Sequence, residues 1–151
     1  MAKAKRPWLK RLLIAFLVLV GIGAAIYFYI ALEKQPDTKN EKAAFTVNAI
    51  DFIREFENDD KTANKKYADK IIIVKGMVSE IEAVDTTVNI KFIDTTSGAY
   101  AIFDFQDQHA AEAKTARVGD FVSIKGSCSG GALSEILGVE FITFKRCTLN
   151  K

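Results

Sequence analysis

Two cysteines, Cys128 and Cys147, are the residues of this chain with the widest range of chemistry. Their spacing is not the Cys-x-x-Cys pattern of thiol oxidoreductases, so redox catalysis is the least favoured role. A disulfide across 19 positions would stabilise the fold by about 3 kcal/mol in chain-entropy models. If the two residues lay at opposite ends of a hairpin, their separation would exceed the roughly 7 Å that a bridge allows. We expect a structural disulfide, with two free or buried thiols as the alternative.

The remaining residue types do not form a known catalytic pattern. His109 is the single histidine and follows the polar stretch 106–108, so we expect a solvated side chain. One histidine and two separated cysteines do not form a zinc-binding set. No serine stands in a Gly-x-Ser-x-Gly elbow, and no glycine-rich phosphate loop precedes a helix. The sequence therefore predicts a protein that is not an enzyme and that needs neither a metal nor a cofactor.

An uncharged run of 21 residues, Leu12 to Leu32, predicts where the rest of the chain works. As a helix it would be about 31 Å long, close to the roughly 30 Å hydrocarbon core of a bilayer. No cysteine lies near it, which argues against a lipoprotein anchor. A cleaved signal peptide is the alternative, because the stretch 21–25 offers small residues near a possible cleavage site. Five cations precede the run, in a basic tail of residues 1–11: Lys3, Lys5, Arg6, Lys10 and Arg11.

The positive-inside rule keeps this tail in the cytoplasm and places everything after the helix outside it. That exported part has 16 Lys and Arg residues against 19 Asp and Glu residues, a formal charge of −3. Proteins that bind nucleic acid through phosphate contacts usually carry a basic surface. The charge therefore disfavours nucleic acid as a partner, and the compartment permits a disulfide.

Hydrophobic periodicity then divides the exported part into elements. Residues 33–45 have no apolar period and predict a linker, and the domain is expected at 46–151. Two short helices are predicted, one from Thr46 and one at 61–67. Strands follow, the first running from Ile71 past Gly76, a glycine typical of a bend at a barrel corner. The other predicted strands are 86–93, 99–105, 121–126 and 139–149, with a helix at 106–115 and a Gly/Ser loop at 127–131.

Five strands with a helix between the third and the fourth is the layout of the OB-fold, a Greek-key barrel of five strands. The predicted class is thus a single transmembrane helix followed by a mainly β (α+β) domain, with two short helices before the barrel. An unrelated small α+β sandwich with the same element order is the alternative.

Several stretches resemble the tRNA-anticodon-domain-like OB-fold proteins, a family of membrane or exported bacterial proteins. The similarity runs from about Thr46 to Leu149, and the segment Gly131 to Gly138 departs from it by lengthening the stretch between the cysteines. The resemblance implies an OB barrel but does not imply tRNA as a ligand. The stretches that carry it are Asn58-Asp59, Ala63 to Tyr67, Lys70, Val74 to Val78, Gly119 to Gly126, Ser127 to Gly130 and Cys147.

In OB-folds a ligand usually crosses the face of the second and third strands. Here that face would carry Asn89, Lys91, Tyr100 and Asp104, with one aromatic side chain and balanced charge. Binders of single-stranded nucleic acid usually present several stacking aromatics instead. The four residues are therefore a candidate ligand face, with ordinary solvated strand positions as the alternative.

Together these patterns predict a single-pass protein of a bacterial inner membrane that displays an OB-type binding module on the periplasmic, extracytoplasmic side. The expected ligand is a protein or another envelope component, and the oligomeric state stays open. Two alternatives belong to different classes. One is a domain that binds single-stranded nucleic acid, and the other is a structural or assembly protein of the cell envelope.

Overall fold

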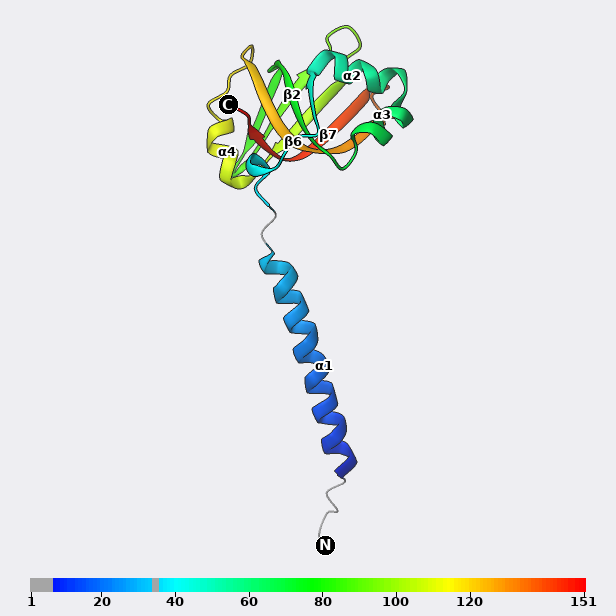
Figure 1. Cartoon of the computed structure of the whole chain (residues 1–151), viewed down its shortest axis with the longest axis vertical. Helices are drawn as coiled ribbons and strands as arrows, with labels where there is room; N and C mark the ends of the chain where they lie inside the picture. Colours follow the sequence, from blue (N-terminus) through cyan, green and yellow to red (C-terminus); the bar gives the residue numbers. More distant parts are fainter. Residues whose placement is uncertain (1–6, 34–35) are drawn as a thin grey trace. The chain divides into compact units, whose positions relative to one another are not determined.

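The computed structural model describes residues 7–33 and 36–151, which fall into two compact units, Met1–Gln35 and Pro36–Lys151. The first unit contains the helix α1 (Pro7–Leu32; Figure 1), and no residue of this helix is buried. Its length and composition suit a membrane anchor or a signal sequence. This confirms the N-terminal apolar helix, which begins earlier than predicted, at a proline that favours the first helical position. The predicted basic residues Lys3, Lys5 and Arg6 lie outside the described residues, as do Lys34 and Gln35 of the predicted linker.

The second unit is built on one mixed sheet of seven strands in the order β1-β2-β6-β7-β5-β4-β3. The pairs β1–β2 and β5–β7 are parallel, and the others are antiparallel. The strands are β1 (Phe45–Asn48), β2 (Ile71–Met77), β3 (Glu80–Val84), β4 (Thr87–Ile93), β5 (Tyr100–Phe105), β6 (Phe121–Leu133) and β7 (Glu140–Leu149). The helices are η1 (Thr38–Asn40), α2 (Ala49–Asn58), α3 (Asp60–Tyr67) and α4 (Asp107–Ala113).

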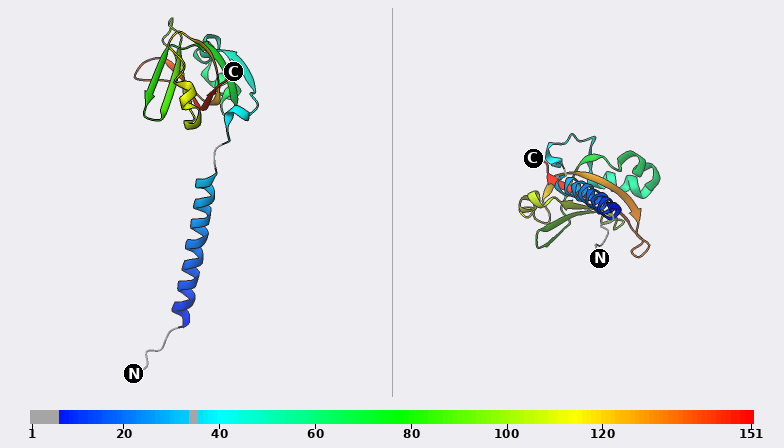
Figure 2. Two further views of the ribbon diagram at one scale, coloured as in Figure 1. Left: turned by 90° about the vertical axis from the view of Figure 1, so that its left-hand side faces the viewer. Right: turned by 90° about the horizontal axis from the view of Figure 1, so that it is seen from below.

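The barrel closes at the junction between β2 and β3, where the chain changes its pairing partner. Val78 N donates to the Asp120 carbonyl at 2.8 Å, whereas the next residue, Ser79, donates from its N to the Lys91 carbonyl at 2.9 Å. The chain thus pairs with β6 before this point and with β4 after it, so β2 and β3 are two halves of one bent strand. Counted this way, the predicted five-stranded OB-like barrel is confirmed, with β1 added beside β2 (Figure 2).

Just before this bend, position 76 is a glycine because α2 lies directly against it. A Cβ atom on Gly76 would come within 2.6 Å of Ala49 Cβ and 3.1 Å of the Phe92 ring. Asn48 caps the helix by accepting a hydrogen bond from Ile50 N at 3.0 Å. Residues 46–48, which were predicted as the start of this helix, instead belong to β1 together with Phe45 of the predicted linker, since they pair with β2. Figures 1 and 2 show α2 and α3 covering a different part of the barrel from α4.

The core lies between these helices and the inner face of the barrel. Phe52 of α2 contacts Phe144 of β7 with ring centroids 5.7 Å apart, and Phe144 stacks on Phe103 at 4.6 Å. Tyr67 of α3 packs edge-on against Phe52 at 4.9 Å, and its hydroxyl donates to Glu55 at 2.7 Å. Aromatic pairs of this kind add stability beyond the area that they bury. They fix α2 and α3 on the barrel.

The segment before β1 packs on the barrel, so the compact unit begins at Pro36, ahead of the predicted boundary at 46. Thr38 is buried, and Lys125 Nζ donates to the Lys39 carbonyl at 3.2 Å. Asp37 Oδ1 lies 2.8 Å from Nε2 of His109 on α4. His109 is therefore buried, which corrects the expectation of a solvated side chain. Its partner is 72 positions away, so the local polar sequence could not reveal the contact.

The predicted loop at 127–131 is also wrong, because β6 continues through it to Leu133. Its glycines meet close packing rather than a turn. A Cβ on Gly131 would come within 2.6 Å of the Phe56 ring, and Gly130 has a φ of 105°. Asn64 of α3 completes the contact, since it donates to the Gly131 carbonyl at 3.0 Å and accepts from Gly131 N at 2.9 Å.

Candidate ligand-binding face

The structure places all four residues of the predicted ligand face on the outer side of β4 and β5. Asn89 lies opposite Asp104, and Lys91 lies two residues further along β4 on the same side. Tyr100 lies opposite Ile93 at the end of this pair. The alternate residues Val88, Ile90 and Phe92 point into the core, as the period of two requires.

Strand β7 adds residues that the sequence analysis did not include. It runs parallel to β5, and the register sets Phe141 beside Tyr100 and Thr143 beside Ile102. The pairing joins strands separated by α4 and β6, so periodicity alone could not reveal it. We call the combined surface the β4–β5–β7 face. It consists of Asn89, Lys91, Tyr100, Ile102, Asp104, Phe141, Thr143 and Lys145.

Two carboxylates neutralise the cation at the centre of this face. Lys91 Nζ lies 2.6 Å from Glu82 and 3.3 Å from Glu80 across the β3–β4 pair. The hydrogen bond to Glu82 raises the pKa of Lys91, and the bond to Glu80 adds to it although partial burial opposes. The ammonium group also lies 5.7 Å from the centre of the Tyr100 ring. Lys91 therefore stays protonated, but the two carboxylates offset its attraction for an external anion.

The aromatic side chains of the face are paired with each other. The rings of Tyr100 and Phe141 stack with centroids 6.2 Å apart and an interplanar angle of 24°. Both side chains are half-buried, so part of the pair is open to a ligand.

A hollow of about 280 Å³ opens on the β4–β5–β7 face, where Asn89, Asp104 and Lys145 are among the residues that line it. Oδ1 of Asn89 is buried there and has no hydrogen-bond partner within 7–33 and 36–151. Burial raises the pKa of Asp104, with a contribution from the Asp107 carboxylate, while Lys145 opposes the shift. An unmet polar atom beside an apolar floor suits a ligand that supplies a hydrogen bond and an apolar group. The lining residues are Thr87, Asn89, Ile102, Asp104, Thr143, Phe144 and Lys145.

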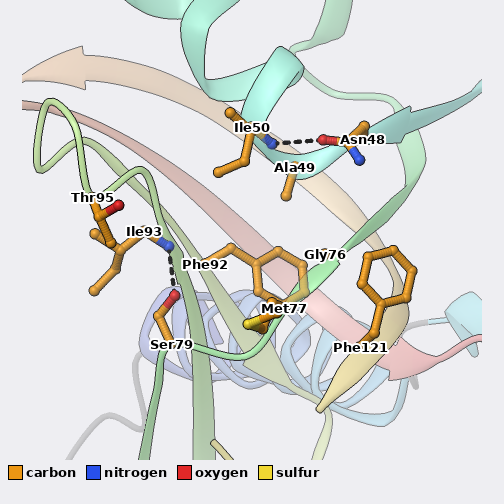
Figure 3. Close-up of a pocket in the computed structure, with 10 residues that line it drawn as sticks. All are labelled: Asn48, Ala49, Ile50, Gly76, Met77, Ser79, Phe92, Ile93, Thr95 and Phe121. Carbon is orange, nitrogen blue, oxygen red and sulfur yellow. Dashed lines mark hydrogen bonds between the residues drawn. The ribbon is translucent and has the colours of Figure 1, made fainter. Parts of the chain in front are cut away.

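A second pocket, of about 330 Å³, lies at the bend between β2 and β3 (Figure 3). Thr95 and Ile93 line one side and Phe121 the other, with Met77 and Phe121 largely exposed. Two of its polar groups are already engaged, because Ser79 Oγ accepts from Ile93 N at 3.0 Å and Asn48 caps α2. The pocket therefore offers mainly apolar contact. The sequence did not predict it, because its lining residues come from segments that are far apart in the chain.

The expected disulfide between Cys128 and Cys147 is not present, and both thiols are free and buried. Lys125 pairs with Thr148 and Ser127 with Lys145, so Arg146 and Cys147 together face Gly126 at a bulge. Cys128 lies two positions along β6 from Gly126, a diagonal that usually separates Cα atoms by about 7–8 Å. Burial raises the pKa of Cys128 to about 11 and that of Cys147 well above its usual value, so neither thiol is poised as a nucleophile.

The described part of the chain holds no group of three or more His, Cys, Asp and Glu residues that could bind a metal ion. His109 bonds to Asp37, and its other close contact is the side chain of Gln108 at 3.5 Å. This pair ties the segment before β1 to α4, which is a structural contact. The β4–β5–β7 face thus remains the candidate ligand-binding surface.

The model of the tRNA_anti-like family matches residues 1–138, a range that includes α1 and most of the barrel. Comparison with curated proteins gives no match.

Among solved structures, a protein from Klebsiella pneumoniae described as a "putative nucleic acid-binding lipoprotein" has a TM-score of 0.53 at 16% identity. The alignment covers 70% of this chain and 91% of that protein, so the two share a fold over nearly its whole length. The structure "OBody AM3L09 bound to hen egg-white lysozyme" gives a TM-score of 0.42 at 17% identity, and the alignment covers 56% of this chain and 84% of that one. A "putative aspartyl-tRNA synthetase" from Leishmania major gives 0.45 at 9% identity and covers 83% of this chain and 25% of its own.

Proposed function

The chain belongs to the tRNA_anti-like family, and from this premise we propose that it is a membrane-anchored binding module. Its β4–β5–β7 face binds a protein or another component of the cell envelope. The helix α1 tethers the barrel to a bacterial inner membrane, with the barrel on the extracytoplasmic side.

The observation that carries this proposal is the position of Lys91 between Glu80 and Glu82. A face that binds a polyanion needs cations that are free to meet phosphates. On this face the central cation is already paired, and Asp104 adds a further carboxylate. The hollow beside Ile102 with its unmet Asn89 oxygen instead favours a ligand that is partly apolar and donates a hydrogen bond.

The proposed location depends on the charges that flank α1. Five cations precede the uncharged run, and a mildly acidic domain follows it. Cytoplasmic flanks of membrane helices carry an excess of Lys and Arg, which supports a cytoplasmic N-terminus and an external barrel.

Copurification from solubilised envelopes tests the binding role. The full chain is compared with Ile102→Asp, which places a charge in the hollow, and with Val84→Asp, an exposed position outside the face. We expect quantitative mass spectrometry to find a component that the full chain and Val84→Asp retain and Ile102→Asp loses. If all three proteins retain the same components in equal amounts, the β4–β5–β7 face is not the binding surface.

Binding of single-stranded nucleic acid is the second candidate function. The stacked rings of Tyr100 and Phe141 favour it, with the exposed Lys145 further along β7, because bases stack on aromatic rings and cations meet phosphates. A labelled oligonucleotide titrated with the full chain in neutral detergent distinguishes the two functions. Binding that weakens steeply with salt and is lost in Tyr100→Ala would support this candidate, and no binding at low salt would end it.

A further inference from the structure

The hairpin that joins β6 and β7 ends in an exposed apolar tip. The exposed fractions of Leu133, Ile136 and Leu137 are 61%, 95% and 63%. The turn is nevertheless ordered, since Ser134 N donates to the Val139 carbonyl at 2.9 Å and Ser134 Oγ accepts from Leu137 N at 3.2 Å. The fold therefore holds three large apolar side chains in water at one fixed place, which is typical of an interaction site.

A buried carboxylate without a partner lies beside this tip. Glu140 pairs with Leu133 in the β6–β7 ladder and is 7% exposed, and its Oε1 atom has no hydrogen-bond partner among the residues that the structure describes. Burial raises the pKa of Glu140, and the nearby carboxylates of Asp60 and Glu57 raise it further. A buried acceptor left unpaired costs about 1–3 kcal/mol, and more when it is charged.

The neighbouring helices bring the other two carboxylates to this place. Glu57 is in the last turn of α2, and Asp60 begins α3. Asn64 fixes α3 beside the hairpin through its two hydrogen bonds to Gly131, at 2.9 and 3.0 Å. This contact between α3 and β6 lies at the end of the barrel where the β6–β7 hairpin turns.

We propose that the apolar tip and the carboxylates of Glu57, Asp60 and Glu140 form one docking surface, which binds a segment of a partner protein that presents apolar side chains next to a Lys or Arg. The cation supplies the donor that Glu140 Oε1 lacks, and the apolar side chains cover Leu133, Ile136 and Leu137. Charge-assisted hydrogen bonds to a carboxylate in such surroundings are among the stronger ones.

The charges of this surface select its occupant. A metal ion does not fit, because no three carboxylates in the described chain are arranged to bind one. Anionic lipid headgroups would meet three carboxylates and Glu135 on the tip itself. A second copy using the same patch would set these carboxylates against their own equivalents. A cationic, partly apolar protein segment is the complementary choice.

Site-specific photo-crosslinking in native membranes tests this proposal. A photoreactive residue replaces Ile136 in the full chain, and the same residue at Val84, an apolar position 69% exposed at the end of β3, is the matched control. We expect an adduct from position 136 alone, with another protein, on a segment that has a Lys or Arg within about one helical turn. Glu57→Lys combined with Asp60→Lys should reduce the adduct yield at least about tenfold.

The charge variant needs a folding check, made from its unfolding midpoint in neutral detergent. If the double variant is unfolded, Glu57→Lys alone at its exposed position replaces it. Adducts only with lipid, only with a second copy, or with no molecule would overturn the proposal. So would an adduct on a segment without a cation, one equally strong at Val84, or one unchanged by charge reversal.

Discussion

Lys91 Nζ lies 2.6 Å from Oε1 of Glu82, diagonally across two antiparallel strands at the centre of the candidate ligand face. Glu80 approaches the same nitrogen at 3.3 Å, so one cation faces two carboxylates. The side chain of Lys91 is 18% exposed, which limits screening of the group by water. This arrangement gives an OB-like barrel a face with little attraction for phosphates.

Removal of both carboxylates should therefore create an attraction that the native face lacks. We expect Glu80→Gln with Glu82→Gln to bind a labelled single-stranded oligonucleotide several-fold more tightly than the native chain at low salt, since Lys91 becomes free to meet a phosphate. Fluorescence anisotropy at several salt concentrations measures this. Glu57→Gln with Glu135→Gln, at two exposed positions away from this face, is the control for net charge. Equal binding by all three proteins would show that the carboxylates do not set the selectivity of the face.

The close approach of α2 to the barrel predicts the effect of one added methyl group. Gly76→Ala should destabilise the fold by about 1–3 kcal/mol, because its Cβ would come within 2.6 Å of Ala49 Cβ. Ala49→Gly in the same chain should recover part of this loss, since it removes the clashing atom. Urea unfolding of the full chain in neutral detergent, followed by circular dichroism, gives the free energies. A Gly76→Ala protein as stable as the native one would mean that α2 does not lie at this distance.

The two buried thiols predict a characteristic pattern of alkylation. With a pKa of about 11, Cys128 is a thiolate in roughly one molecule in ten thousand at pH 7, so the folded chain should react very slowly. In urea without a reductant, both Cys128 and Cys147 should be labelled, as intact mass would show. Labelling that needs a reductant would reveal a disulfide and contradict the free thiols.

The unpaired carboxylate of Glu140 predicts a dependence of stability on pH. Its pKa in the folded chain is raised above the usual 4.5, so the folded state binds this proton more tightly than the unfolded state does. The charge of Glu140 therefore costs stability above the raised pKa, and the cost disappears as the pH falls towards 4.5. Glu140→Gln should stabilise the chain at pH 7 by about 1 kcal/mol or less.

Unfolding curves at several pH values measure this difference, with Glu135→Gln at an exposed position as the control. The gain from Glu140→Gln should shrink as the pH approaches 4.5, while the control should stay within about 0.5 kcal/mol of the native chain. A variant that is less stable than the native chain at pH 7 would indicate that Glu140 has a partner.

Local patterns predicted what depends on neighbours in sequence. The alternation along β4 and β5 placed Asn89, Lys91, Tyr100 and Asp104 on one surface, because side chains of a strand point alternately to opposite faces. The order of strands around one helix, which also follows from local periodicity, predicted the OB-like barrel. The uncharged run from Leu12 likewise predicted an apolar helix without reference to any other part of the chain.

Contacts between distant segments were beyond these patterns. His109 has polar neighbours in the sequence, but it is buried and contacts Asp37 from a distant segment. The glycines at 130 and 131 indicated a loop, although they make room for side chains of α2 and α3. The contribution of β7 to the face depends on its parallel pairing with β5, which no local period records. The bridge between Cys128 and Cys147 is absent because Cys128 pairs with Phe144, three positions before Cys147, in a register that the sequence did not reveal.

The location of the barrel is the claim on which the proposed role depends, and a reporter fused after Lys151 tests it most directly. Alkaline phosphatase, which needs an oxidising compartment, should be active in this fusion, and a reporter that works only in the cytoplasm should be silent. Activity of the cytoplasmic reporter together with silent phosphatase would place the barrel inside the cell and contradict the account.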